Sequence, residues 1–190
     1  MWSDKWTERA RKEGYPARSV YKLKEANEKF RFIRRGFKVL ELGASPGSWT
    51  KYVLECIGEE GLVVAIDLKP LSIPPDRRLV FLENDVFEID LKELFNASGG
   101  KFDVLLSDMA PNTTGVPVVD QEISFNLAKK ALEIAKELVR KGGFFLIKFF
   151  EGENSRELVS FAKTFSTTKL FRPAATRKSS SEIYLFGMIR

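Results

Sequence analysis

The chain has 190 residues, 44% of them hydrophobic and 30% charged, a composition typical of a folded globular protein and not of a disordered one. Its length fits one domain, so we treat residues 1–190 as a single domain that includes a basic helical extension over residues 1–38. One cysteine excludes an internal disulfide, and the lack of histidine leaves no nitrogen and sulfur cluster for zinc. We assign no metal ligands, although a carboxylate-bound magnesium stays open.

The predicted elements begin with a helix over residues 16–30, which places Val20, Leu23, Asn27 and Phe30 on one face. Short apolar runs then predict strands buried on both faces, as in a parallel sheet. These strands cover residues 39–43, 62–68, 79–83, 102–108 and 143–149. Helices are expected over residues 49–57, over 119–140 with Gly142 and Gly143 ending it, and over 154–165.

Two further strands, at residues 168–173 and 182–189, are joined by a loop too short for a crossover helix. They should therefore pair antiparallel. The alternation of strands and helices predicts a doubly wound, Rossmann-like α/β fold. Its sheet has seven strands and is mostly parallel, with an antiparallel last strand and an extra N-terminal helix.

The first strand runs into the turn Glu41-Leu42-Gly43-Ala44-Ser45-Pro46-Gly47-Ser48-Trp49, in which Ser48 can cap the next helix. The turn is not a phosphate loop, because Ser48-Trp49 follows the last glycine where that loop needs Lys-Ser or Lys-Thr. Ser45 also replaces the middle glycine of a dinucleotide fingerprint, which argues against a pyrophosphate. Asp67 ends the second strand, where an acid can bind a ribose diol, and Asp85 follows the third, where it can bind an adenine amino group. Adenosyl recognition without phosphates points to S-adenosylmethionine.

Lys148 lies inside an apolar strand, where a lysine needs partners. The topology supplies two of them. Asp108 ends the adjacent parallel strand, and Glu182 begins the last strand at the same edge of the sheet. Lys22, on the N-terminal helix, can close over this group.

These residues resemble the FtsJ/RrmJ (RlmE) family of RNA 2′-O-ribose methyltransferases over essentially the whole chain. The matching segments are Arg18-Ser19-Val20-Tyr21-Lys22-Leu23, Pro46-Gly47-Ser48-Trp49, Ser107-Asp108-Met109-Ala110-Pro111-Asn112, Lys148-Phe149-Phe150-Glu151-Gly152 and Ser179-Ser180-Ser181-Glu182-Ile183-Tyr184. The chain departs from the family at Ser45 and Ser48, because the family turn usually reads Ala-Ala-Pro-Gly-Gly-Trp.

The resemblance implies a class I methyltransferase fold and a catalytic tetrad of Lys22, Asp108, Lys148 and Glu182. It also implies cofactor contacts from Gly43, Gly47, Trp49, Asp67, Asp85 and Asp108. A ribose hydroxyl is a poor nucleophile, so a positioned base assists in-line methyl transfer. We assign Lys148 as this base, Asp108 to the placing of the methyl group and ribose, and Lys22 and Glu182 to holding the nucleotide.

Charge is unevenly distributed along the chain. Residues 1–38 hold 12 Lys or Arg against 5 acids and residues 163–190 hold 6 against 1, which leaves 13 against 20 in the middle. Basic ends around an acidic centre predict a phosphate-binding face that is separate from a site for a cationic ligand. The RNA contacts that we predict are Arg18, Arg34, Arg35, Arg177 and Lys178.

The expected substrate is a uridine of large-subunit (23S) ribosomal RNA, because the short chain without an extension favours the ribosomal branch of the family. A transfer-RNA anticodon-loop methyltransferase, a nicotinamide-dependent oxidoreductase and a non-catalytic ribosome-assembly factor remain as alternatives. A polar N-terminus and the lack of an apolar run of about 18 residues predict a cytoplasmic protein without a membrane partner. Nothing indicates an obligate protein partner.

Overall fold

A seven-stranded sheet in the order β3-β2-β1-β4-β5-β7-β6 forms the centre of the computed structural model, which describes residues 5–111, 114–177 and 179–190. Strands β1 to β5 run parallel, and β7 pairs antiparallel with both β5 and β6. The predicted fold class is therefore confirmed. The strands are β1 (Lys38–Leu42), β2 (Leu62–Asp67), β3 (Leu79–Glu83), β4 (Phe102–Ser107), β5 (Val139–Phe150), β6 (Ser166–Phe171) and β7 (Glu182–Ile189).

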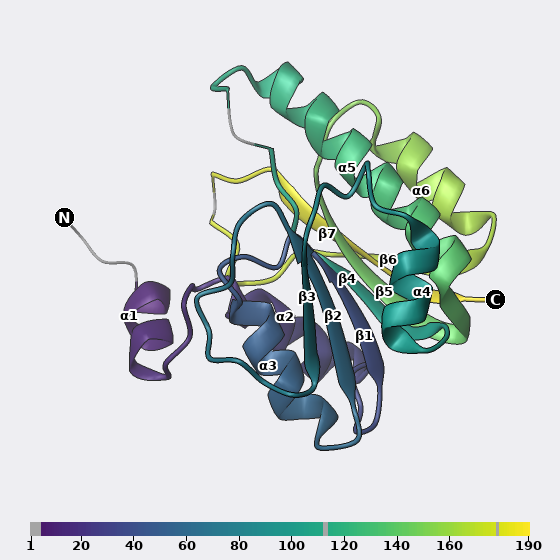
Figure 1. Ribbon diagram of the computed structural model, residues 1–190. Coiled ribbons are helices and arrows are strands. Elements are labelled where there is room, and N and C mark those ends of the chain that lie inside the picture. The colour runs from purple at the N-terminus through teal and green to yellow at the C-terminus, as the bar shows by residue number, and fades with distance from the viewer. Residues whose placement is uncertain (1–4, 112–113, 178) are drawn as a thin grey trace.

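Helices cover both faces of the sheet (Figure 1). The helices α2 (Val20–Phe30) and α3 (Ser48–Ile57) pack on one face, and α4 (Leu91–Ser98), α5 (Pro117–Leu138) and α6 (Ser155–Lys163) pack on the other. Each face has its own apolar core, in which a fully buried Leu or Phe contributes roughly 1.5–3 kcal/mol.

The side chains of β5 alternate between these two cores. Phe145, Ile147 and Phe149 point to the α4–α6 core, whereas Phe144 and Leu146 point to the α2–α3 core. A strand has a side-chain period of two, so Lys148 belongs to the α2–α3 face. This alternation brings a lysine inside the sheet toward the N-terminal helix α2.

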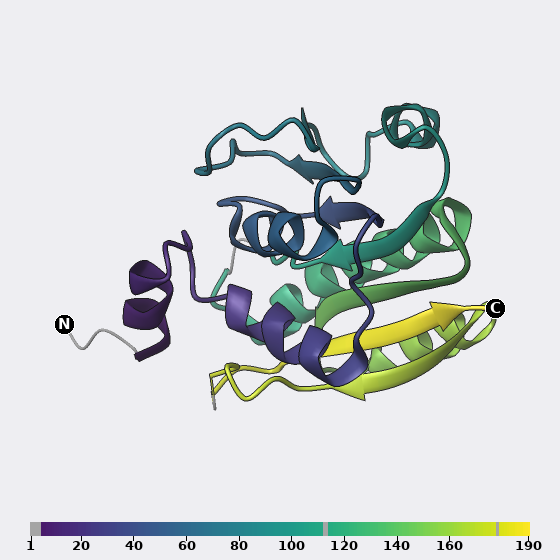
Figure 2. The ribbon, with the colours of Figure 1, turned by 90° about the horizontal axis from the view of Figure 1, so that it is seen from below.

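Two helices were not predicted. Helix α1 (Lys5–Lys12) stands to one side of the body in Figures 1 and 2 and is held there by aromatic contacts. The ring centroids of Trp6 and Tyr21 are 5.0 Å apart, and the guanidinium of Arg9 lies 4.9 Å from the Tyr21 ring centroid. Helix α4 begins at Asp90, whose side chain caps the helix by accepting a hydrogen bond from Lys92 N at 2.9 Å.

Several predicted boundaries were wrong, among them that of β6, which spans Ser166–Phe171 and not residues 168–173. Helix α5 ends at Leu138 and not near residue 140, and Gly142 and Gly143 lie within β5 instead of stopping the helix. Between the pairs Phe102–Val139 and Val104–Phe144 the register shifts, so β5 bulges there, and Gly142 supplies the φ of 74° that few other residues adopt. Helix α2 begins at Val20 and not at residue 16.

Within the described ranges, no helix is long and apolar enough to cross a membrane.

Candidate active site

Lys148 and Asp108 form a buried ion pair at the carboxyl ends of β4 and β5. The parallel register pairs Ser107 with Ile147, which brings the next residue of each strand side by side. Lys148 Nζ lies 3.0 Å from Asp108 Oδ1 and also donates to the Asp108 backbone carbonyl at 2.5 Å. Only 6% of the lysine is exposed. Of the two partners predicted for Lys148 from topology, Asp108 is in contact with it, whereas the carboxylate of Glu182 pairs with Lys22.

Lys22 and Glu182 form a second ion pair beside the first. Glu182 begins β7 and pairs with Phe150 of β5, while Lys22 lies in the first turn of α2. The Lys22 ammonium is 2.7 Å from the Glu182 carboxylate, and both side chains are nearly buried. The four residues predicted as a tetrad therefore meet at one edge of the sheet, as two ion pairs.

Tyr184 links the two pairs and was missed by the sequence analysis. It pairs with Lys148 across β5 and β7, and its hydroxyl donates to Asp108 Oδ1 at 2.9 Å. Burial, followed by the carboxylates of Asp108 and Glu182, raises the Tyr184 pKa well above its ordinary value. The phenol is therefore neutral and acts as a fixed hydrogen-bond donor. A period-two reading from Glu182 would have placed Tyr184 on the same face of β7.

A cavity of about 480 Å³ opens next to these pairs, at the carboxyl ends of β1, β2, β3 and β4. It includes Gly43, Asp67, Asp85 and Asp108, four of the residues predicted to contact the cofactor. The full lining is Gly43, Ser45, Pro46, Ile66, Asp67, Leu68, Lys69, Asn84, Asp85, Val86, Asp108, Met109, Ala110 and Leu127. Three carboxylates against one lysine make the cavity acidic, which suits a ligand with a positive charge.

The carboxylates of the cavity are oriented by backbone amides. Ser45 N donates to Asp67 Oδ2 and Lys69 N donates to Asp67 Oδ1, both at 2.9 Å. Phe87 N donates to Asp85 Oδ1 at 2.9 Å. Each carboxylate oxygen has two lone pairs, so those of Asp67 can still accept hydrogen bonds from a ribose diol. These residues fit an adenosyl group.

The glycine turn shapes the floor of the cavity. Gly43 has a φ of 75°, and a Cβ there would lie 2.9 Å from backbone atoms of Met109, so a side chain is excluded. Gly47 begins α3 with a φ of 105° and faces Ile73. Ser48 does not cap this helix as predicted, because its hydroxyl accepts a hydrogen bond from Ala17 N at 2.6 Å.

Trp49 lies in the core and not in the wall of the cavity. Its indole is 2% exposed, and Nε1 donates to the backbone carbonyl of Ser19 at 2.9 Å. The ring also packs 6.0 Å from that of Tyr184. The structure therefore places the Trp49 side chain behind the site, where it fastens α3 to the segment that precedes α2.

Glu41 is a second residue that the sequence analysis did not single out. It is 1% exposed beneath the cavity and accepts a hydrogen bond from Thr50 Oγ1 at 2.8 Å. Burial raises the pKa of Glu41 to about 8, with smaller contributions from Asp108 and Asp67. This carboxyl group is protonated over much of the neutral range, and it joins β1 to α3.

The predicted RNA contacts are divided between two edges of the sheet. Arg18 Nη2 donates to Ala175 O at 2.7 Å, and Arg177 is exposed in the same loop, which precedes β7 at the catalytic edge. Arg34 and Arg35 are exposed in the connection before β1, at the opposite edge. Lys178 lies outside the described residues.

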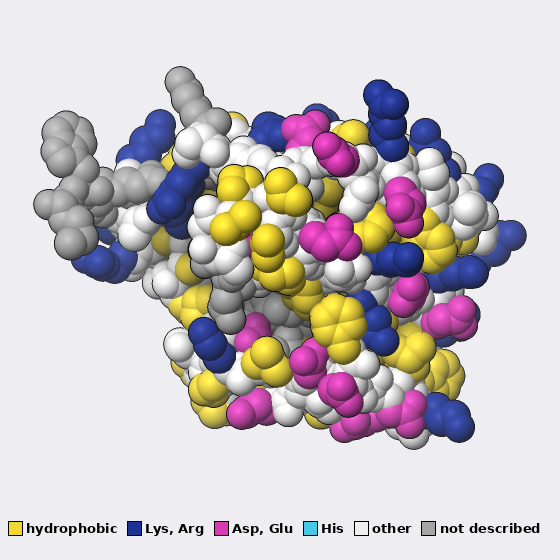
Figure 3. Space-filling view, turned by 90° about the horizontal axis from the view of Figure 1, so that it is seen from above, with side chains coloured by type: hydrophobic (Ala, Val, Ile, Leu, Met, Phe, Trp, Pro, Cys, Tyr) yellow, Lys and Arg dark blue, Asp and Glu magenta, His cyan; other side chains and the backbone are white. Residues whose placement is uncertain are grey.

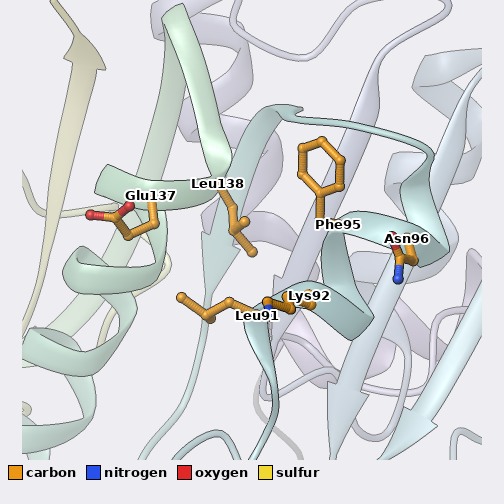
Figure 4. A pocket seen from close by; sticks show the side chains of 6 residues that line it. All are labelled: Leu91, Lys92, Phe95, Asn96, Glu137 and Leu138. Carbon is orange, nitrogen blue, oxygen red and sulfur yellow. The ribbon is translucent and has the colours of Figure 1, made fainter.

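The surface above the cavity is visible in Figure 3, where hydrophobic side chains gather beside a hollow bordered by acidic ones. A separate pocket of about 300 Å³ lies between α4 and the end of α5 (Figure 4). Leu138, in its wall, directly precedes β5, so this pocket is at the edge of the sheet opposite Lys148. It belongs to no part of the catalytic group.

Solved structures share the fold of this protein. A ribosomal RNA methyltransferase from Plasmodium falciparum superposes with a TM-score of 0.78 at 24% identity, covering 92% of this chain and 98% of that chain. Fibrillarin from Aeropyrum pernix, solved with S-adenosyl-L-methionine, superposes with a TM-score of 0.63 at 14% identity, covering 90% and 76%. The fold is that of Rossmann-like methyltransferases.

Sequence comparison identifies the family. Residues 15–190 match the FtsJ-like methyltransferase family. A ribosomal RNA large subunit methyltransferase E from Desulfatibacillum aliphaticivorans is 43% identical over 98% of this chain and 90% of its own length. The protein of that name from Treponema denticola is 45% identical over 97% and 94%. The chain belongs to the FtsJ-like methyltransferase family, which confirms the resemblance and an S-adenosylmethionine-dependent methyltransferase activity.

Proposed function

We propose that this protein transfers a methyl group to the 2′-hydroxyl of a uridine ribose in large-subunit ribosomal RNA. The observation that carries the proposal is that Asp108 belongs to both parts of the site. It lines the acidic cavity, and its Oδ1 lies 3.0 Å from Lys148 Nζ. A hydroxyl placed beside Asp108 lies between the cofactor cavity and the lysine. The names of the relatives from D. aliphaticivorans and T. denticola support the ribosomal substrate.

The cofactor, when bound, supplies an electrophilic methyl group on a sulfonium. Lys148 accepts the proton of the ribose hydroxyl, because it is the basic side chain that lies beside Asp108 at this position. Asp108 orients Lys148 and the ribose. Lys22 and Glu182, 2.7 Å apart, hold the nucleotide at the mouth of the site.

The cofactor contacts follow from the walls of the cavity. Asp67 binds the ribose diol, Asp85 binds the adenine amino group, and the backbone of Gly43 gives the close approach that a side chain would block. Gly47 and Trp49 support the turn from behind, since Trp49 is buried.

Arg18 and Arg177 belong to the proposed RNA face because they lie against and in the loop before β7, and Lys178 stays a prediction from the sequence. Arg34 and Arg35 are left out of the face around Lys148, because they lie at the other edge of the sheet. The cytoplasmic location and the lack of an obligate protein partner stay predictions.

The decisive experiment incubates the protein with labelled S-adenosylmethionine and either large ribosomal subunits or transfer RNA, and then maps the methylated nucleotide. Label on the 2′-oxygen of one ribosomal uridine is expected. Label in a transfer-RNA anticodon loop would instead identify the protein as a transfer-RNA methyltransferase of the same family. Absence of transfer, with RNA binding retained, would favour an assembly factor. A parallel binding assay with a nicotinamide dinucleotide tests the oxidoreductase alternative.

A further inference from the structure

A smaller cavity of about 190 Å³ lies where α5, the end of β5 and the start of α6 meet. It is separate from the cofactor cavity, with which it shares no lining residue. Its volume is below the roughly 300–1,000 Å³ of sites for drug-sized ligands. The cavity therefore suits one small flat group, and its walls include Val118, Gln121, Phe125, Phe149, Gly152 and Asn154.

The chemistry of this cavity fits a neutral heterocycle. Phe125 and Phe149 provide apolar walls, while the Gln121 amide provides a donor and an acceptor. Asn154 Nδ2 already donates to Glu122 Oε2 at 3.0 Å. A Cβ on Gly152 would lie 2.7 Å from Gln121 Oε1, so the glycine leaves room for the amide. The lining contains no Lys or Arg, and Glu122 and Glu153 are part of it, so a phosphate is disfavoured. Unpaired nucleobases are recognised by this combination of stacking and edge hydrogen bonds.

The cavity is close to the catalytic lysine. Phe150, in its wall, follows Lys148 by two residues, which is roughly 7 Å along a strand. Helix α5 is fixed over this strand end because Phe150 N donates to Ser124 Oγ at 2.9 Å. Phe149 points to the α4–α6 core, so the cavity opens on the face of the sheet opposite Lys148. A base in this cavity would belong to a nucleotide whose backbone passes the end of β5.

Exposed apolar side chains lie at the start of α5, and one of them, Val118, lines the cavity. Val118 is 74% exposed, Val119 43% and Ile123 38%. A group of exposed apolar side chains commonly marks an interaction surface. Figure 3 shows hydrophobic side chains gathered on this face of the molecule, next to the hollow.

From these observations we infer that the small cavity takes an unpaired base of the RNA substrate, from a nucleotide that neighbours the methylated ribose. The inference rests on the proposed function. In this arrangement Arg18 and Arg177 contact the phosphates, and the cavity walls around Phe125 and Phe149 contact the base. A peptide segment of a ribosomal protein is the competing occupant of this surface.

The test combines a double variant, Val118→Ser with Gln121→Ala, and RNA fragments that carry an abasic residue at each position flanking the target. Leu170→Ser is the matched control, because Leu170 is 53% exposed on β6 and lines none of the cavities described above. Single-turnover methyl transfer is measured for every pair of protein and RNA. Cofactor affinity, measured by calorimetry, verifies that each variant is folded.

We expect the double variant to lose about tenfold in kcat/KM on unmodified RNA, as does the wild type on one abasic RNA, because a stacked base typically contributes that much. The variant should lose nothing further on that abasic RNA, and Leu170→Ser should match the wild type throughout. Two results would overturn the inference. One is that the losses caused by the double variant and by the abasic residue multiply at every flanking position. The other is that the double variant has the wild-type rate on unmodified RNA. A loss seen with whole subunits but not with the RNA fragment would overturn it in favour of a protein partner. Absence of transfer by the wild type itself would instead refute the proposed function.

Discussion

Tyr184 donates a hydrogen bond to Asp108 Oδ1 at 2.9 Å, and the same oxygen lies 3.0 Å from Lys148 Nζ. One carboxylate oxygen thus receives two donors from two neighbouring strands, β5 and β7. The buried phenol restricts the carboxylate to one orientation. This arrangement fixes Lys148 before the substrate arrives.

Replacing Tyr184 with Phe should destabilise the fold more than it slows the reaction. The lost hydrogen bond to a carboxylate should lower the free energy of unfolding by about 1.5–3 kcal/mol. Lys148 keeps both of its contacts with Asp108, so turnover should fall less than tenfold. Urea unfolding and single-turnover transfer measure the two effects. A loss of turnover as large as that of a Lys148 variant would assign Tyr184 a direct role in the chemistry.

The Lys22–Glu182 pair should show strong coupling. Replacing Glu182 with Leu leaves the nearly buried Lys22 ammonium without its partner, which should cost roughly 3 kcal/mol of unfolding free energy. Lys22→Met should cost a similar amount, and the double variant should cost clearly less than the sum. A double-mutant cycle by urea unfolding measures this coupling. Additive effects would mean that the two side chains do not interact.

Glu41 should make the fold less stable as the pH rises. Its pKa is raised from 4.5 to about 8 in the folded state, so the neutral carboxyl stabilises the fold fully below pH about 4.5. This stabilisation is lost as the pH rises toward 8. Glu41→Gln should therefore flatten the decline in unfolding free energy between pH 5 and pH 8. Glu133→Gln, on the exposed face of α5, is the control and should follow the wild-type curve. Parallel curves for the Glu41 variant and the wild type would show that Glu41 is ionised in the folded protein.

The sequence predicted the sheet edge that carries the site, because chain order and strand direction are enough to bring Asp108, Lys148 and Glu182 together. The contact of Lys22 with Glu182 depends on how α2 packs, and the sequence indicated only that Lys22 can close over the group. Tyr184 was overlooked because an aromatic residue in a strand is ordinary core by composition. Gly142 and Gly143 were misread because a glycine pair marks a bulge as readily as the end of a helix.

Helix α4 could have been found from Asp90 followed by Leu91, Leu94 and Phe95 at helical spacing. Helix α1 could not, because it has only one buried residue and is attached by contacts between Trp6, Arg9 and the distant Tyr21. The position of the Trp49 side chain could not be predicted either, because a tryptophan in a turn can face a ligand or the core. Here its Nε1 donates to the backbone carbonyl of Ser19.

Arg177 and Arg35 should differ in their effect on RNA binding. Both side chains are exposed, but Arg177 lies in the loop before β7 and Arg35 lies at the opposite edge. Arg177→Ala should weaken RNA binding and reduce the slope of log affinity against log salt by about one, as for the loss of one phosphate contact. Arg35→Ala should change neither. Filter binding over a range of salt concentrations measures both quantities. Equal losses for the two variants would mean that the RNA also covers the far edge.

Replacement of Lys148 with Ala tests the account most directly. The variant and the wild type are compared by single-turnover methyl transfer to the large-subunit RNA, and their cofactor affinities are measured in parallel. Loss of a general base should lower the rate at least about 100-fold. Cofactor affinity should be nearly unchanged, because Lys148 is not in the wall of the cofactor cavity. A Lys148→Ala variant that transfers the methyl group at the wild-type rate would contradict the assignment of Lys148 as the base.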